Sequence, residues 1–312
     1  MKHSLKITAL LLLIFVLAQI NGFFVLDYYF DIDKSAVLGE AVADEATAED
    51  SYLPQAEVEN KSMSAIYIMI ALLLGTAAIL LLIKFRQRRL WKLWFLMSVF
   101  IALIFSLHTW IFRIFDSFFS AYILYAITVI LCLVLAYYKV IKANIIIHNF
   151  TEIFIYGGIT ALIAPILNVF SVAILMILLA IYDAYAVWKS KHMIKLAEFQ
   201  TKEKVFAGLC IPYKIKSEKV IKTKETKNIT SKKKEAKMRT AVLGGGDVAF
   251  PLLFSSVVML ATGSYIPAII ITATTTTALA GLFYFGEKGK FYPAIPFIAV
   301  GCFIGYGISL LI

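Results

Sequence analysis

Two aspartates stand inside long apolar stretches of this sequence, Asp183 in IYDAYAVW and Asp247 in LGGGDVAFP. A carboxylate in a membrane-spanning segment costs about 3 kcal/mol, so each is a candidate for function. Two carboxylates held close together cannot both ionise, and they titrate as a coupled pair that shares a proton. One member can then activate water while the other protonates a carbonyl oxygen, which is the chemistry of acid–base hydrolysis.

The residues around these aspartates are those of an integral membrane protein. The chain has 312 residues and is 61% hydrophobic, above the roughly 45–50% of soluble domains. A bilayer core is crossed by about 20 apolar residues, and the sequence predicts an all-α membrane protein with about nine transmembrane helices. The apolar runs are 5–26, 63–83, 90–112, 118–138, 144–164, 168–188, 239–262, 266–286 and 291–311.

Two hydrophilic segments divide these runs. The segment 27–62 holds ten acidic residues, and 189–238 is rich in lysine. We expect residues 1–188 to form six helices with an acidic external loop, 189–238 to form a basic, partly disordered cytoplasmic loop, and 239–312 to form three further helices. The first run lacks a clean small-x-small cleavage site, so it is interpreted as a retained helix.

The distribution of basic residues predicts the orientation. With a cytoplasmic N-terminus, 27 of the 30 Lys and Arg residues fall on the cytoplasmic side, and only Lys34, Lys61 and Arg113 lie outside. Cytoplasmic loops of membrane proteins carry such an excess. The sequence therefore predicts a protein of the cell membrane with its N-terminus inside and its C-terminus outside. The net charge of +10 is assigned to topology and anionic lipid rather than to nucleic acid.

The predicted helices bring the two aspartates to a similar depth. Asp183 lies about six residues from the cytoplasmic end of its helix, and Asp247 about eight residues from the start of its helix at Arg239, which correspond to roughly 9 and 12 Å. Two antiparallel neighbours would thus place both carboxylates near one level. The alternative is that each aspartate caps a kink or pairs with a distant polar group; the matched depth and the motifs beside the aspartates favour a shared site.

The residues beside the aspartates suggest room for a peptide. Gly244, Gly245 and Gly246 precede Asp247 directly, although each glycine in a helix interior costs about 1 kcal/mol relative to alanine. They would let the backbone unwind and a substrate approach, or simply permit close helix packing. Tyr182 can shield the adjacent acid or belong to an interfacial aromatic belt.

The last run opens with FYPAIPFIAVG, in which Pro293 and Pro296 interrupt the first turns of the helix. Backbone groups freed by such a break are tolerated only if they are buried in protein or line a wet cavity.

Tyr-Asp, Gly-x-Gly-Asp and Pro-Ala-Ile, in this order on a nine-helix chain, resemble the presenilin and signal peptide peptidase family, most closely its short archaeal members. The resemblance covers most of the chain, including the long loop between the two aspartate helices. One difference is Ile295, where the family has leucine.

This resemblance implies a presenilin-like fold and an intramembrane aspartyl protease that acts on transmembrane-helix proteins without a metal or other cofactor. Asp183 and Asp247 would form the catalytic dyad. The implied substrate-binding residues are Tyr182, Gly244, Gly246, Pro293, Ala294 and Ile295. We further expect the segment from Thr240 to Leu243 to hold an unwound substrate by strand addition.

Two other functions stay open at this point. An ion or proton-coupled transporter or leak channel would also use intramembrane acids. A prepilin peptidase also has a Gly-x-Gly-Asp motif, but a basic residue is expected soon after its aspartate, whereas Val248-Ala249-Phe250 follow here.

The remaining candidates are expected to be structural. Cys132, Cys210 and Cys302 are far apart and lack metal-ligand spacing. His148 stands alone, and Glu152, near the start of the fifth helix, is predicted to be interfacial rather than catalytic.

Overall fold

The computed structural model of the chain describes residues 5–38, 41–44, 61–85, 87–190, 206–216, 236–286 and 292–312. The large helices are α1 (Leu5–Tyr29), α4 (Ser64–Lys84), α5 (Arg88–Phe115), α6 (Ala121–Val140), α7 (Ile145–Ile163), α8 (Val169–Tyr185), α10 (Gly245–Thr262), α11 (Tyr265–Phe285) and α12 (Ile295–Ser309). A short helix, α2 (Ile32–Leu38), follows α1, and strands β1 (Gly208–Lys216) and β2 (Ala236–Gly244) precede α10.

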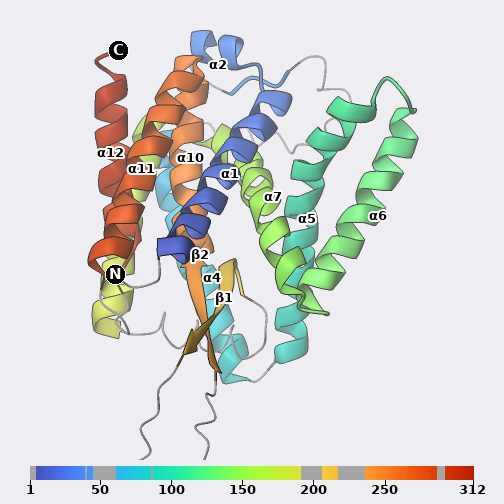
Figure 1. Cartoon of the computed structure of the whole chain (residues 1–312). Coiled ribbons are helices and arrows are strands. Elements are labelled where there is room, and N and C mark those ends of the chain that lie inside the picture. The colour runs from blue at the N-terminus through green and yellow to red at the C-terminus, as the bar shows by residue number, and fades with distance from the viewer. Residues whose placement is uncertain are drawn as a thin grey trace, which may run out of the picture.

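These helices form a bundle (Figure 1). Within the described ranges, eight helices are long and apolar enough to cross a membrane, and α12, with 15 residues, is a shorter apolar helix. The predicted multi-pass all-α membrane protein is therefore confirmed. Helix α12 begins at Ile295 rather than near 291. Pro296 at its second position is tolerated because a backbone N–H there has no intrahelical partner.

Helix α10 is the most enclosed span, and α4 is the most exposed. In the most apolar window of α10, 61% of the residues are buried inside the protein, against 6% for α4. Helices α1, α7, α8, α11 and α12 all contact α10. The chain segment that carries Asp247 is thus at the centre of the bundle, and α4 presents most of its apolar surface to lipid.

Polar side chains of α1 link the helices inside the bundle. Asn21 donates to the carbonyl of Ile153 in α7 at 3.0 Å and accepts from the indole N–H of Trp110 in α5 at 2.8 Å. Gln19 donates to the carbonyl of Val248 in α10 at 3.1 Å. Interhelical hydrogen bonds of this kind help to fix helix positions where lipid supplies no hydrophobic driving force.

A two-stranded hairpin lies at one end of the bundle (Figure 1). β1 and β2 pair antiparallel with a register that runs from Gly208 opposite Gly244 to Lys216 opposite Ala236. The expected helix from Arg239 is wrong, since residues up to Gly244 lie in β2 and the helix begins at Gly245. Part of the predicted basic loop is therefore a hairpin, and residues 191–205 and 217–235 lie outside the described residues.

The ends of the chain point to opposite faces of the bundle. Helix α1 begins near the hairpin end, and α12 finishes at the other end, where α2 also lies (Figure 1). An N-terminus and a C-terminus on opposite sides agree with an odd number of crossings. Which face is cytoplasmic stays a prediction from the basic residues.

Candidate active site

Asp183 is held in the last turn of α8. This helix begins at a capping box in which the Asn168 side chain accepts from Ser171 N–H and the Ser171 hydroxyl accepts from Asn168 N–H, an arrangement that satisfies two otherwise free donors. A short π-helical segment, Ala186–Ser190, follows α8, and such segments are frequent at functional sites. Asp183 is buried, with 6% of its surface exposed.

The Pro-Ala-Ile motif contacts Asp183 directly. The backbone N–H of Ile295 donates to Asp183 Oδ2 at 3.2 Å. Ile295 is the first residue of α12, and the first N–H groups of a helix have no acceptor within the helix. Asp183 therefore satisfies a free donor of α12, and the contact fixes the orientation of its carboxyl group.

Asp247 is positioned by a strand-to-helix transition. It is the third residue of α10, directly after β2 and the N-cap residue Gly244. Gly245, the first helical residue, donates its N–H to the carbonyl of Ala207 at 3.1 Å. The expected depth of about eight helical residues is therefore wrong, because the path from Arg239 is a strand.

The glycines provide space rather than unusual backbone angles. Among the described residues, positive φ values at glycine occur only at Gly208 and Gly263. A Cβ atom on Gly244 would lie 3.1 Å from Asp247 Oδ2, and one on Gly246 would lie 3.3 Å from the Phe250 ring. The expectation that the backbone unwinds at these glycines is not what the structure shows. Their small size leaves room beside the carboxylate.

One cavity of about 660 Å³ brings the predicted residues together. Both aspartates line it, and so do Tyr182, Gly244, Gly246, Ala294 and Ile295. The remaining predicted residue, Pro293, is buried beside them but is not among the lining residues. Most other lining side chains are apolar, so the cavity combines an apolar wall with three acids, the two aspartates and Glu152.

The sequence did not predict several lining residues. Tyr156 and Glu152 of α7 face the cavity, and a Cβ on Gly245 would lie 3.4 Å from the Tyr156 hydroxyl oxygen. Glu152 is only 2% exposed, so it is buried within the protein. That it is interfacial rather than catalytic stays a prediction. A signal for the burial of Glu152 was the pairing of a lysine at the end of one run, Lys139, with an acid in the next.

The described part of the chain contains no group of three or more His, Cys, Asp or Glu side chains arranged to hold a metal ion.

Residues 36–312 match the family described as "Signal-peptide peptidase, presenilin aspartyl protease". A comparison with curated proteins gives no match.

Two solved structures of a presenilin family intramembrane aspartate protease resemble the chain. The one in space group C222 has a TM-score of 0.60 at 16% identity, with 97% of each chain covered. The one in space group P2 has a TM-score of 0.62 at 16% identity, with 96% of each chain covered. At this identity the likeness shows that the fold is shared. With its multi-pass presenilin-like fold, the chain belongs to the signal-peptide peptidase and presenilin family of aspartyl proteases.

Proposed function

We propose that Asp183 and Asp247 are the catalytic dyad with which this intramembrane aspartyl protease cuts peptide bonds inside transmembrane segments of other membrane proteins. The observation that carries the proposal is that both carboxylates line one cavity within the helix bundle. Membership in a family of aspartyl proteases favours hydrolysis over the alternative of ion or proton transport.

The dyad divides the work of hydrolysis. Both carboxylates meet the start of a helix, Asp247 in the first turn of α10 and Asp183 at the Ile295 N–H of α12, 3.2 Å away, and free backbone N–H groups there favour a negative charge on either one. The pair is therefore assigned a single shared proton. One member takes a proton from water, and the other delivers the shared proton to the carbonyl oxygen of the scissile bond.

The other cavity residues are assigned to the substrate. A helical substrate hides its carbonyl groups within its own hydrogen bonds, so it must unwind before water can attack. The apolar wall of the cavity suits the side chains of a membrane segment. Gly244 and Gly246 leave space for its backbone, and Tyr182, Ala294 and Ile295 complete the wall. Lipid and the transmembrane substrate are the partners that this site requires.

The outer edge of β2 is assigned the role of holding the unwound substrate. Both backbone groups of Cys210 bond to the Asn149 side chain, so they point away from β2. Cys210 is opposite Val242. In an antiparallel ladder, the backbone N–H and C=O groups of two directly opposed residues either all point toward the partner strand or all point away from it. The N–H and C=O of Val242 therefore lie on the outer edge of β2, and this residue is 41% exposed.

Proline substitution tests this edge. Val242→Pro removes an outward N–H, whereas Ala241→Pro removes one that points toward β1. We expect Val242→Pro to weaken substrate binding while the hairpin persists. Unchanged KM and cleavage rate with Val242→Pro would exclude strand addition at this residue.

The dyad is tested by incubating the purified protein with a transmembrane substrate. Asp183→Asn and Asp247→Asn should each slow cleavage by roughly a hundredfold or more, which is the usual contribution of a positioned acid or base. Asp116→Asn, an exposed change at the end of α5, is the matched control and should cleave normally. Cleavage that survives either dyad substitution would refute the assignment. Ion flux without any proteolysis by the wild type would support the transporter instead.

A further inference from the structure

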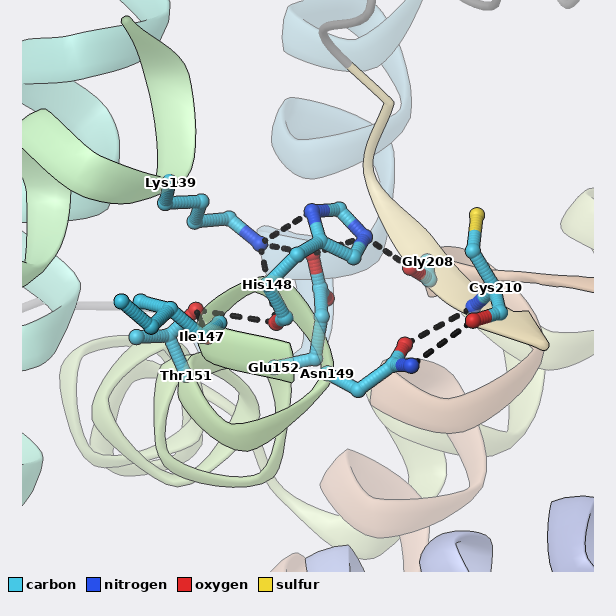
Figure 2. Close-up of polar contacts among 8 residues, drawn as sticks. All are labelled: Lys139, Ile147, His148, Asn149, Thr151, Glu152, Gly208 and Cys210. Atoms are coloured by element: carbon cyan, nitrogen blue, oxygen red, sulfur yellow. Dashed lines mark hydrogen bonds and ion pairs between the residues drawn. The ribbon is translucent and has the colours of Figure 1, made fainter. Parts of the chain in front are cut away.

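Four polar side chains of α6 and α7 form a cluster beside the hairpin: Lys139, His148, Asn149 and Glu152 (Figure 2). We refer to these four residues as the docking cluster. Lys139 Nζ and Glu152 Oε1 are 2.6 Å apart, and their side chains are only 1% and 2% exposed. Removing two charges from water costs several kcal/mol per ion, and their attraction offsets this only in part. A buried pair is therefore weak evidence for stability by itself, and its contacts with neighbouring groups indicate a role in positioning.

His148 connects the ion pair to β1. Its Nδ1 lies 3.1 Å from Lys139 Nζ, and its Nε2 lies 2.7 Å from the carbonyl oxygen of Gly208 (Figure 2). An ammonium group only donates and a carbonyl only accepts. The proton of the neutral ring is therefore on Nε2, and the lone pair on Nδ1 faces the lysine. Lys139 thus fixes the tautomer in which His148 donates a hydrogen bond to the strand.

Asn149 binds the next part of β1. Its Oδ1 accepts from Cys210 N–H at 2.9 Å, and its Nδ2 donates to the Cys210 carbonyl at 2.7 Å (Figure 2). A neighbouring β-strand would make the same pair of bonds. Helix α7 therefore occupies the outer edge of β1 at this residue and directs an incoming strand to β2.

The docked part of β1 touches the turn that carries Asp247. Ala207, next to Gly208, accepts from the N–H of Gly245 at 3.1 Å, and Gly245 is the first residue of α10. Gly208 has a φ of 139°, and a Cβ atom on it would lie 2.3 Å from the carbonyl oxygen of Leu243. Glycine is needed at this close crossing. A shift of β1 would therefore move the start of α10.

We propose that the docking cluster holds β1 against α7 and thereby sets the position of Asp247 relative to Asp183. The four residues are positioning residues, since they act on the dyad through the hairpin. The inference rests on the proposed catalytic role of Asp247. A misplacement of a reacting group by about 1 Å can cost a hundredfold in rate, so loss of docking should appear mainly in the rate at saturating substrate.

Asn149→Leu is the first test, because it removes both bonds to Cys210, keeps a similar shape and leaves the buried charges paired. We expect the cleavage rate at saturating substrate to fall between about tenfold and a hundredfold. The matched control is Asn144→Ala in the same helix. It removes two N-cap bonds, to Ile146 N–H and Ile147 N–H, and should leave cleavage within about twofold because a lost cap costs only about 1 kcal/mol.

Cys210 reports the docking itself. Burial, and then the negative charge of Glu152, raise the pKa of the Cys210 thiol to about 11. The thiolate is the reactive form, so Asn149→Leu should speed iodoacetamide alkylation of Cys210 about tenfold or more. Cys132 and Cys302 are fully buried in the bundle and should stay unreactive, which separates undocking of the hairpin from general unfolding.

A second pair of variants tests the histidine. His148→Gln keeps an N–H donor near the position of Nε2 and should retain most of the cleavage rate, whereas His148→Leu should lose it. If Asn149→Leu makes all three cysteines reactive, that variant has unfolded, and the two His148 variants then test the proposal. An equal loss in the two His148 variants would then overturn the proposal.

Two results with Asn149→Leu would overturn the proposal directly. One is slow cleavage while Cys210 stays protected, and the other is full cleavage while Cys210 reacts freely. Failure of the dyad looks different: Asp247→Asn would then cleave normally, whatever the reactivity of Cys210. If both proposals hold, Asp247→Asn is inactive with Cys210 protected.

Discussion

Two ion pairs of nearly equal length lie toward opposite ends of the bundle. Lys139 and Glu152 are 2.6 Å apart near the hairpin, with side chains 1% and 2% exposed. Arg113 and Asp27 are 2.7 Å apart near the ends of α5 and α1 away from the hairpin (Figure 1), with side chains 31% and 34% exposed. The distance between the charged atoms is thus almost the same, and the surroundings differ completely.

The surroundings decide what each pair does. Asp27 also accepts from the Tyr265 hydroxyl, and Arg113 lies 4.3 Å above the centre of the Phe24 ring. This half-exposed group joins α1, α5 and α11, and such pairs contribute about 0.2–1 kcal/mol. The buried pair instead orients His148 toward the hairpin. Under the proposal above, the buried pair is therefore expected to be costly to break and to affect cleavage, whereas the exposed pair is expected to do neither.

Breaking the buried pair should give the largest effect. Glu152→Leu leaves the Lys139 ammonium buried without its counter-charge, and we expect a loss of about 3–5 kcal/mol in the free energy of unfolding. The double variant Lys139→Met/Glu152→Leu should recover most of this stability but still cleave slowly, because His148 loses the cation that fixes its tautomer. Unfolding of the purified protein in increasing concentrations of denaturing detergent measures the stability of the single and the double variant. A double variant no more stable than the single one would show that the unpaired charge is not the cause.

A substitution at Gly208 should have the next largest effect, and it tests whether the hairpin must stay docked for cleavage. Gly208→Ala places a side chain where φ is 139° and a Cβ would lie 2.3 Å from Leu243 O. We expect about 1–3 kcal/mol of local strain, faster alkylation of Cys210 and slower cleavage. Gly281→Ala in α11 is the control, since nothing lies within 4 Å of its Cβ. Equal behaviour of the two variants would argue against a docked hairpin.

A substitution at Gly244 should have a smaller effect, and it separates the position of the Asp247 carboxylate from the stability of the fold. Gly244 has φ −62° and ψ 146°, which alanine adopts freely, but its Cβ would lie 3.1 Å from Asp247 Oδ2. Gly244→Ala should change the free energy of unfolding by less than about 0.5 kcal/mol and slow cleavage about tenfold by displacing the carboxylate. Parallel unfolding and kinetic measurements check this. Loss of stability without loss of rate would contradict it.

The exposed pair should give the smallest effect. Arg113→Gln is expected to cost less than about 1 kcal/mol and to leave the cleavage rate unchanged, because the pair lies at the far end of the bundle from the hairpin. A cost above about 3 kcal/mol in the same unfolding assay would break the comparison between the two pairs.

The apolar helices were predictable because their signal is local. The run 168–188 corresponds to α8 (Val169–Tyr185) with its π-helical extension, and the single acid in it is Asp183. Thr240 to Leu243 were expected to pair with a substrate strand, and they lie in β2, but the pairing of β2 with β1 was not predicted. Ala241 to Leu243 near the end of β2 are apolar and are followed by three glycines, within which the apolar helix α10 begins. A short apolar run does not distinguish a strand from a helix. The run of glycines from Gly244 to Gly246 was the sequence signal for the start of the helix at Gly245.

The polar contacts between helices were harder to predict. Glu152 pairs with Lys139 because α6 and α7 pack side by side across a short connection. The contact of Asp183 with Ile295 joins two distant parts of the chain. Both depend on how the helices are packed, which the spacing of residues along one sequence does not determine. The Pro-Ala-Ile motif was nevertheless predicted to lie beside the dyad, and Ile295 of this motif contacts Asp183.

The central claim is that Asp183 and Asp247 act together on a peptide bond inside the membrane. Mass spectrometry of the products from a purified transmembrane substrate tests it most directly, with the wild type beside Asp183→Asn and Asp247→Asn. The account predicts new termini within the apolar span of the substrate for the wild type, and intact substrate for both variants. Cuts confined to the polar flanks, or the same products from either variant, would contradict it.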